Sequence, residues 1–180
     1  DAAKEKENVE KIAVVGSRAA PRSVGESPVP IDIIGAEEFA NQGNPDMLNM
    51  LSTLVPSFNI NTQAISDAAT LIRPANLRGL GPDQTLVLVN GKRRHRASVI
   101  AFAGGGISDG AQGPDISVIP AVAIRQVEVL RDGAAAQYGS DAIAGVINIV
   151  LNDNVDELTG TISYGAYSTK ADGNFPAGTP

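Results

Sequence analysis

The alternation of apolar and polar residues is clearest within residues 124–151. Residues 124–131 alternate as a half-buried strand does, with Val127 and Val129 on one face and Glu128 on the other. We therefore predict that this segment is a strand with one face packed on the core and one face toward solvent.

A short helix and a second strand follow this first strand. An Asp-Gly turn at 132–133 precedes a run of good helix formers over 134–138, which ends at Gly139. The strand over 145–151 is apolar on nearly both faces, so it requires cover on both sides. The pattern predicts a strand–helix–strand unit on which the rest of the domain is built.

Similar patterns predict the other elements. An amphipathic helix is expected over 44–55, with Asn44 as its N-cap, Pro45 at its first position and Asp46 in its first turn. A helical turn is expected at 35–39. Strands are expected at 30–34, 58–61 and 85–91, the last ending in an Asn-Gly hairpin-type turn. The predicted class is α+β: one small domain with a mixed sheet of about four strands, short helices and long loops.

A long segment without periodicity, residues 92–114, interrupts these elements. It begins with a basic run, residues 92–96, which holds four of the 14 Lys and Arg residues, and it continues into a Gly-rich stretch. Long loops in compact domains are usually functional or disordered, so the run is either an anion-binding loop or simply solvated.

The composition excludes several classes of function. The chain has no Cys and only one His, His95, which leaves no transition-metal cluster and no obvious Ser-His triad. Residues 79–84 begin like a phosphate-binding Gly motif but lack its third Gly and precede a strand. A net charge of −6 argues against a nucleic-acid partner, and no apolar run approaches the roughly 20 residues of a membrane-spanning helix. We expect no enzyme, no cofactor and no bound metal.

Three segments together resemble the plug domain of TonB-dependent outer-membrane receptors. The letters QVEVLRDGAAAQYGSDAIAGVINIVL at 126–151 resemble the end of such plugs, and LRGLGPDQTLVLVNGKRR at 77–94 resembles an earlier part. The predicted helix at 44–55 is similar to a plug helix, with Ser57 where the family has Gly. The resemblance implies a plug that closes an outer-membrane β-barrel, helps to bind an extracellular nutrient or metal chelate, and opens for uptake into the periplasm.

The resemblance also implies a domain organisation. Residues 1–11 are expected to be a disordered leader, 12–18 a TonB-box-like segment, 19–29 a linker and 30–153 the plug. Residues 154–180 would hold the first barrel strand, at 158–167, and a disordered end, with the rest of the barrel absent. The TonB C-terminal domain would pair with five residues by adding a strand: Ile12, Ala13, Val14, Val15 and Gly16. Many such boxes carry Thr at the place of Val15.

Two further sets of residues follow from the resemblance. Loop residues that face outward in the family imply ligand contacts for Arg73, Arg93, Arg94, His95 and Arg96. Arginines within the matched motifs imply contacts between the plug and the barrel wall for Arg78 and Arg131. An ion pair inside the plug, for example with Glu128, is the structural alternative for these two. A free-standing periplasmic ligand-binding domain is the alternative function.

Overall fold

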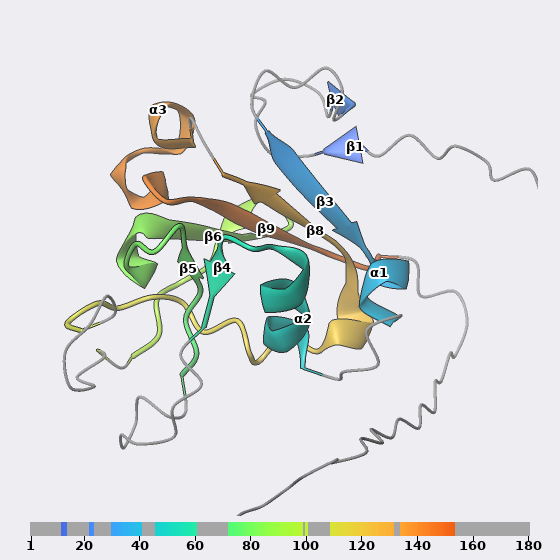
Figure 1. Ribbon diagram of the computed structural model, residues 1–180, viewed down its shortest axis with the longest axis horizontal. Helices are drawn as coiled ribbons and strands as arrows, with labels where there is room; N and C mark the ends of the chain where they lie inside the picture. Colours follow the sequence, from blue (N-terminus) through green and yellow to red (C-terminus); the bar gives the residue numbers. More distant parts are fainter. Residues whose placement is uncertain are drawn as a thin grey trace, which may run out of the picture.

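A five-stranded mixed sheet forms the centre of the domain (Figure 1). The computed structural model describes residues 12–13, 22–23, 30–40, 46–60, 72–98, 100, 109–131 and 134–153. The strands lie in the order β3 (Ile31–Gly35), β8 (Ile124–Leu130), β9 (Gly145–Leu151), β6 (Thr85–Val89) and β7 (Lys92–Arg93). Strands β6 and β9 pair in parallel, and the other neighbours pair antiparallel. The predicted mixed sheet is confirmed.

The fifth strand was not predicted. Strand β7 contains the first two residues of the basic run, Lys92 and Arg93, which we had placed in a loop. They pair antiparallel with Val89 and Leu88 across a tight turn at Asn90 and Gly91, both of which have positive φ. Such a turn requires left-handed backbone at two successive residues, which Asn-Gly adopts readily. The Asn-Gly turn therefore allows the sheet to continue into Lys92 and Arg93, although these charged residues show no apolar pattern.

Short helices and a second strand pair complete the described elements. The helices are α1 (Ala36–Ala40), α2 (Met47–Leu54) and α3 (Ala134–Tyr138). Strand β4 (Phe58–Asn59) pairs with β5 (Asn76–Leu77), and β1 (Ile12–Ala13) pairs with β2 (Arg22–Ser23). Three-residue 3-10 turns precede β6, β8 and β9. The strand–helix–strand unit predicted for 124–151 is confirmed.

Helix α2 begins later than predicted. Its N-cap is Asp46, whose Oδ1 accepts a hydrogen bond from the backbone N–H of Leu48 at 3.0 Å. We had placed Asp46 inside the first turn and Asn44 at the cap; residue 44 lies outside the described residues. Both side chains are good caps, but the first helical residue is Met47, so Asp46 is the residue that can satisfy the exposed N–H groups of the first turn.

Apolar side chains pack on both faces of the sheet. Helix α2 and the β4–β5 pair lie over one face (Figure 1), where the largest cluster includes Leu48, Leu51, Leu77, Val127 and Ile147. A smaller cluster covers the other face beside α3 and includes Ile31, Leu86, Leu88, Leu130, Val146 and Ala134. Strand β9 is buried along Gly145 to Val150, as its two apolar faces predicted.

Strand β8 is more buried than its sequence pattern suggested. We expected Glu128 to face solvent on a half-buried strand, but its side chain is fully buried. The reason is the position of β8 between β3 and β9, with a second apolar cluster on the face that carries Glu128. Its carboxylate is retained in the interior by hydrogen bonds from Gln126 and Asn148.

The start of β9 depends on a glycine at close range. Gly145 has φ of +146°, and a Cβ at this position would lie 2.5 Å from the carbonyl oxygen of Leu130 and 3.1 Å from Cδ1 of Leu77. Only glycine fits this backbone and this contact.

Two predicted segments lie outside the described residues, namely 14–16 of the pairing segment and the strand at 158–167. Within the described part of the chain, no helix has the length and apolar character needed to cross a membrane.

Candidate functional site: a basic groove beside β6 and β7

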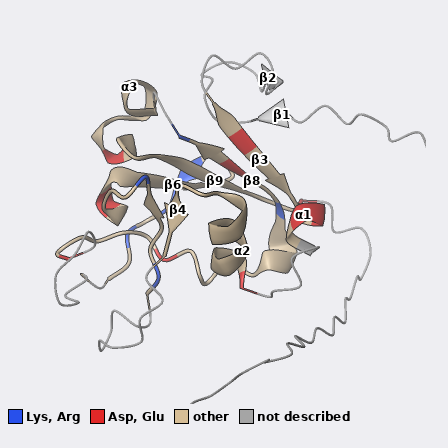
Figure 2. Cartoon of the chain, viewed as in Figure 1, with Lys and Arg blue, Asp and Glu red and all other residues tan. Residues whose placement is uncertain are grey.

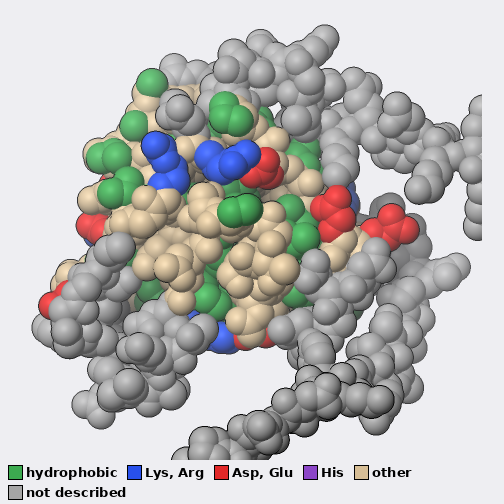
Figure 3. Space-filling view, in the orientation of Figure 1, with side chains coloured by type: hydrophobic (Ala, Val, Ile, Leu, Met, Phe, Trp, Pro, Cys, Tyr) green, Lys and Arg blue, Asp and Glu red, His purple; other side chains and the backbone are tan. Residues whose placement is uncertain are grey.

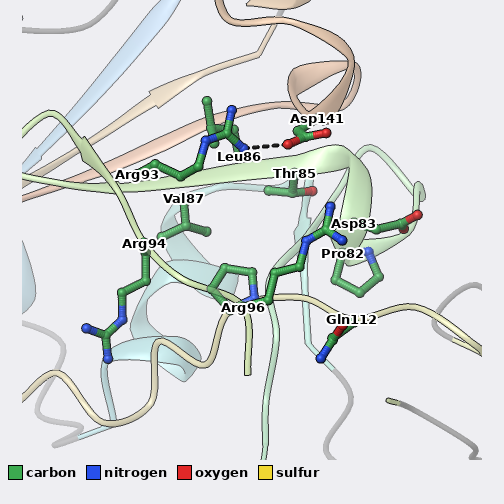
Figure 4. Close-up of a pocket in the computed structure, with 11 residues that line it drawn as sticks. Pro82, Asp83, Thr85, Leu86, Val87, Arg93, Arg94, Arg96, Gln112 and Asp141 are labelled. Atoms are coloured by element: carbon green, nitrogen blue, oxygen red, sulfur yellow. Dashed lines mark hydrogen bonds and ion pairs between the residues drawn. The ribbon is translucent and has the colours of Figure 1, made fainter. Parts of the chain in front are cut away.

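The basic run leaves the edge of the sheet in extended form. After β7, the N–H of Arg94 donates to the carbonyl of Val87 at 2.9 Å, which continues the pairing with β6. Successive side chains of an extended segment point to opposite sides. Figure 4 shows this directly, since Arg93 points toward Asp141 and Arg94 extends to the other side of the strand.

A shallow groove runs along this edge (Figure 4). Basic side chains, two carboxylates, an amide and apolar residues line it: Pro82, Asp83, Thr85, Leu86, Val87, Arg93, Arg94, Arg96, Gln112, Pro114 and Asp141. Its cavity volume is about 20 Å³, which is room for about one water molecule. The groove can therefore contribute contacts to a ligand, but it cannot enclose one without another surface.

The charges in the groove are not equivalent. Arg93 forms an ion pair with Asp141, which follows α3, and both side chains are partly exposed. Arg96 is exposed and Arg94 is half-buried. Figure 4 shows the guanidinium of Arg96 near Asp83 and Pro82. His95 is exposed on the same extended segment. The groove therefore presents a net positive surface in an otherwise acidic chain.

The end of the basic run is fixed to the returning chain. The N–H of Ala97 donates to the carbonyl of Gly113 at 3.1 Å, and Nε2 of Gln112 donates to the carbonyl of Ala97 at 2.6 Å. A Cβ on Gly113 would lie 2.6 Å from Cβ of Pro82 and 2.7 Å from Cβ of Pro74. The base of the long loop is thus held by close packing, which limits the directions that Arg94 and Arg96 can take.

Arg73 lies apart from this groove and has a local partner. Its Nη1 donates to Oδ2 of Asp46 at 2.6 Å, with about a third and a quarter of the two side chains exposed. Partial burial acts to raise the pKa of Asp46, but the hydrogen bond and charge of Arg73, together with the N–H groups of Leu48 and Asn49, lower the pKa below its ordinary value of 3.8. Asp46 therefore both caps α2 and holds Arg73.

This pair leads to a pH-dependent stability. Because the folded-state pKa of Asp46 is depressed, its contribution is fully present above pH 3.8 and is lost as the pH falls through the folded pKa. Asp46→Asn keeps a capping oxygen but removes the charge. We expect the wild-type chain to exceed this variant by about 0.5 kcal/mol in free energy of unfolding at pH 6, and this difference to shrink as the pH falls below 3.8.

Urea denaturation of both chains at several pH values measures this difference. Arg73→Gln is the matched control, because it should remove the part of this contribution that comes from Arg73 at pH 6 without touching the cap. A difference between wild type and Asp46→Asn that persists unchanged at pH 2 would contradict the assignment.

Arg78 and Arg131, the two motif arginines, lie next to each other. Arg78 has left-handed backbone, and its Nη1 donates to the carbonyl of Arg131 at 3.0 Å. Arg131 Nη2 donates to Oδ1 of Asp32 at 2.9 Å, and its Nε lies 2.9 Å from Oδ2. The local ion pair of Arg131 is therefore with Asp32 on β3, not with Glu128. Basic and acidic side chains also lie side by side on the face of the domain in Figure 3.

Several residues of these sites were not predicted from the sequence. Asp141 and Asp32 come from segments far along the chain from their arginine partners, so only the fold reveals the pairing. Gln112 lies in a Gly-rich stretch without pattern. Figure 2 shows acidic and basic residues scattered along the described elements. No group of three or more His, Cys, Asp or Glu residues in the described ranges could hold a metal.

The predicted pairing segment is described only at its first two residues. Strand β1 pairs antiparallel with β2, with Ile12 opposite Ser23 and Ala13 opposite Arg22.

Comparison with known families decides what kind of domain this is. The family model described as the TonB-dependent Receptor Plug Domain matches residues 23–146, which include β3, the basic groove and most of the strand–helix–strand unit. The chain belongs to the TonB-dependent receptor plug domain family. The suspected resemblance is thereby confirmed, and the arginine positions of both motifs lie within the matched plug region.

Curated relatives agree with this membership. A ferric enterobactin receptor of Pseudomonas aeruginosa is 32% identical over 81% of this plug chain and 18% of its own length. A ferrienterobactin receptor of Escherichia coli is 31% identical over 76% of the chain and 18% of its own length. A vitamin B12 transporter of Vibrio vulnificus is 36% identical over 66% of the chain and 17% of its own length. These relatives are receptors and transporters, which is consistent with a plug that is not an enzyme.

A solved structure supports the fold. A ferric enterobactin receptor mutant of Pseudomonas aeruginosa, in complex with enterobactin, aligns with a TM-score of 0.51 at 31% identity, over 68% of this chain and 17% of that chain. The plug chain spans less than a fifth of the length of these relatives.

Proposed function

We propose that this chain is the gate of a TonB-dependent transporter in the outer membrane of a Gram-negative bacterium. It would lie inside a β-barrel formed by further chain, with its N-terminus toward the periplasm. The observation that carries this proposal is the plug-family match over residues 23–146, together with the sheet that those residues build. The names of the relatives, which are receptors and transporters of iron chelates and vitamin B12, favour uptake over a free-standing periplasmic binding domain.

We further propose that the groove beside β6 and β7 contributes to recognition of an extracellular anionic nutrient or metal chelate. Arg94 and Arg96 line the groove, and guanidinium groups bind carboxylates and related anions through two parallel hydrogen bonds. The small volume of the groove implies that loops of the barrel supply the rest of the ligand contacts. We propose ligand contacts also for Arg93 and His95 of the same run, and for Arg73, which lies beside Asp46.

Arg78 and Arg131 are proposed to contact the barrel wall. Arg78 is exposed and Arg131 keeps more than a third of its side chain accessible while it contacts Asp32. Both side chains therefore remain accessible to a surface that would surround the domain.

Opening would begin when the TonB C-terminal domain adds a strand to residues 12–16. Backbone hydrogen bonds supply the affinity in such pairing, and pockets for alternate side chains supply the specificity. Strand β1 already pairs with β2 in this chain, and a pair of two-residue strands is at best marginally stable. At Ile12 and Ala13 the partner would therefore have to displace only the two-residue strand β2.

The test is an NMR titration of the chain with the TonB C-terminal domain of the same organism. We expect resonance shifts or broadening confined to about residues 12–18, and their loss in Val14→Pro, because proline removes a backbone donor. Val122→Ala, at an exposed site remote from the segment in sequence, is the control and should titrate like the wild type. A lack of any shift at millimolar partner would refute the pairing role of this segment.

A further inference from the structure

A buried polar network connects the interior of the sheet to the start of the basic run. Asn148 on β9 and Glu128 on β8 are cross-strand neighbours, and both side chains are fully buried. Nδ2 of Asn148 donates to Oε2 of Glu128 at 3.1 Å, and Nε2 of Gln126 donates to Oε1 of the same carboxylate at 2.7 Å. The backbone N–H of Gly91 donates to Oδ1 of Asn148 at 2.9 Å. The network ends at the turn that precedes Lys92.

The chemistry of this network fixes the orientation of the Asn148 amide. Both oxygens of Glu128 accept hydrogen bonds, so the amide nitrogen of Asn148 must face the carboxylate. That leaves its oxygen toward Gly91, whose N–H requires an acceptor. If the amide were rotated by 180°, a donor would face the Gly91 N–H and an acceptor would face the carboxylate, and both contacts would be repulsive.

The turn that this amide holds sets the direction of the basic run. Two more hydrogen bonds join the turn to β9: the N–H of Asn90 donates to the carbonyl of Ile149 at 2.9 Å, and the N–H of Leu151 donates to Oδ1 of Asn90 at 2.8 Å. Gly91 then leads directly into β7 and the groove. Because Gly91 has φ of +74° and exposes its backbone, the Asn148 contact restrains the point at which the chain leaves the sheet.

Burying these polar groups costs free energy, so stability alone does not explain why Asn148 and Glu128 occupy these positions. Leu86, Leu88, Leu130 and Val146 form an apolar cluster on the same face of the sheet. Apolar side chains of similar volume at 128 and 148 would avoid burying a carboxylate and an amide. Polar groups that are retained in such surroundings, and that reach the backbone N–H of Gly91, fit a requirement for a defined turn.

We propose that Asn148, oriented by Glu128, is a positioning residue that aims the basic run 92–96 along its groove. The anion-binding part of this proposal rests on the function proposed above for the groove. Suppose that, without the Gly91 contact, the run adopts the direction that binds an anion for only about a third of the time. The measured Kd for the anion then rises about threefold. The proposal thus concerns affinity and geometry, not contact between Asn148 and the ligand.

The experiment uses Asn148→Ala in the chain described here, with citrate as the anionic probe. We expect the amide resonances of residues 91–96 to move and the Kd for citrate to rise about threefold. Val146→Ala, on the same face of β9, is the matched control: it removes buried volume and lowers stability, but it leaves the network intact. Glu128→Gln is a second variant of nearly unchanged shape, in case Asn148→Ala fails to fold. It removes the requirement that fixes the amide, so it should move the same resonances by a smaller amount.

The outcomes separate this proposal from the proposed function. Movement of residues 91–96 in Asn148→Ala or Glu128→Gln, and not in Val146→Ala, supports the positioning role. If wild type does not bind citrate while those resonances still move, the positioning role stands and the anion-binding role of the groove fails. Unmoved resonances in both network variants, or equal movement in Val146→Ala, would overturn the proposal.

Discussion

Gly145→Ala is expected to lower the free energy of unfolding by about 2–4 kcal/mol. Two costs combine at this position. The backbone φ of +146° lies in a region that side chains rarely adopt, and the new Cβ would lie 2.5 Å from the carbonyl oxygen of Leu130. That oxygen belongs to the adjacent strand β8, so relief would require the centre of the sheet to separate.

Gly35→Ala is the matched control for this variant. Gly35 ends the edge strand β3, has no left-handed backbone, and offers a new Cβ no neighbour within 4 Å. The same chemical change there should alter stability by less than about 1 kcal/mol, because it only reduces the freedom of the unfolded chain. Urea denaturation followed by circular dichroism measures both variants. Equal effects at the two glycines would show that the close contact at Gly145 does not exist.

Leu51→Ala is expected to destabilise the domain by about 2–5 kcal/mol. Leu51 is fully buried where α2 packs on the sheet, and its removal leaves a cavity between the two layers. Helix α2 has only eight residues, so its stability comes from this packing and not from helix propensity.

The control lies three residues further along the same helix. Leu54 is only partly buried against the same cluster, so Leu54→Ala removes the same atoms with less lost contact. We expect it to cost about 1 kcal/mol. Denaturant midpoints at an unchanged m-value measure the two costs. Similar losses for Leu51→Ala and Leu54→Ala would be inconsistent with the packing of α2 described here.

The elements with strong periodicity could be predicted, and the charged partnerships could not. The strand–helix–strand unit over 124–151 was predictable because apolar alternation and Gly139 indicate its parts. The burial of Glu128 was not, because a lone carboxylate in an alternating strand normally faces solvent. Its burial depends on β3, whose pairing with β8 joins distant parts of the chain.

The candidate site shows the same division. The concentration of charge at 92–96 and the Asn-Gly turn were visible in the sequence. Three features depended on the fold: the extension of β7 into the run, the pairing of Arg93 with Asp141, and the contact of Asn148 with Gly91. The two side-chain contacts join residues that are about 50 or more positions apart in the chain. Strand β7 was missed for another reason, because it lacks any apolar residue.

The pairing of β3 with β8 and of β6 with β9 has a consequence for the speed and order of folding. Asp32 on β3 and Arg131 beyond β8 are 99 positions apart in the chain, and β6 reaches its parallel partner β9 only after some 60 residues. Contacts between residues this distant form only after large loops close, and loop closure lowers the entropy of the chain before the contacts can stabilise it. We therefore expect a slow folding step. A growing chain that ends before residue 124 holds β3, α2 and β6 without the strands that bury them. Until β8 and β9 are made, those apolar segments are open to association with other chains.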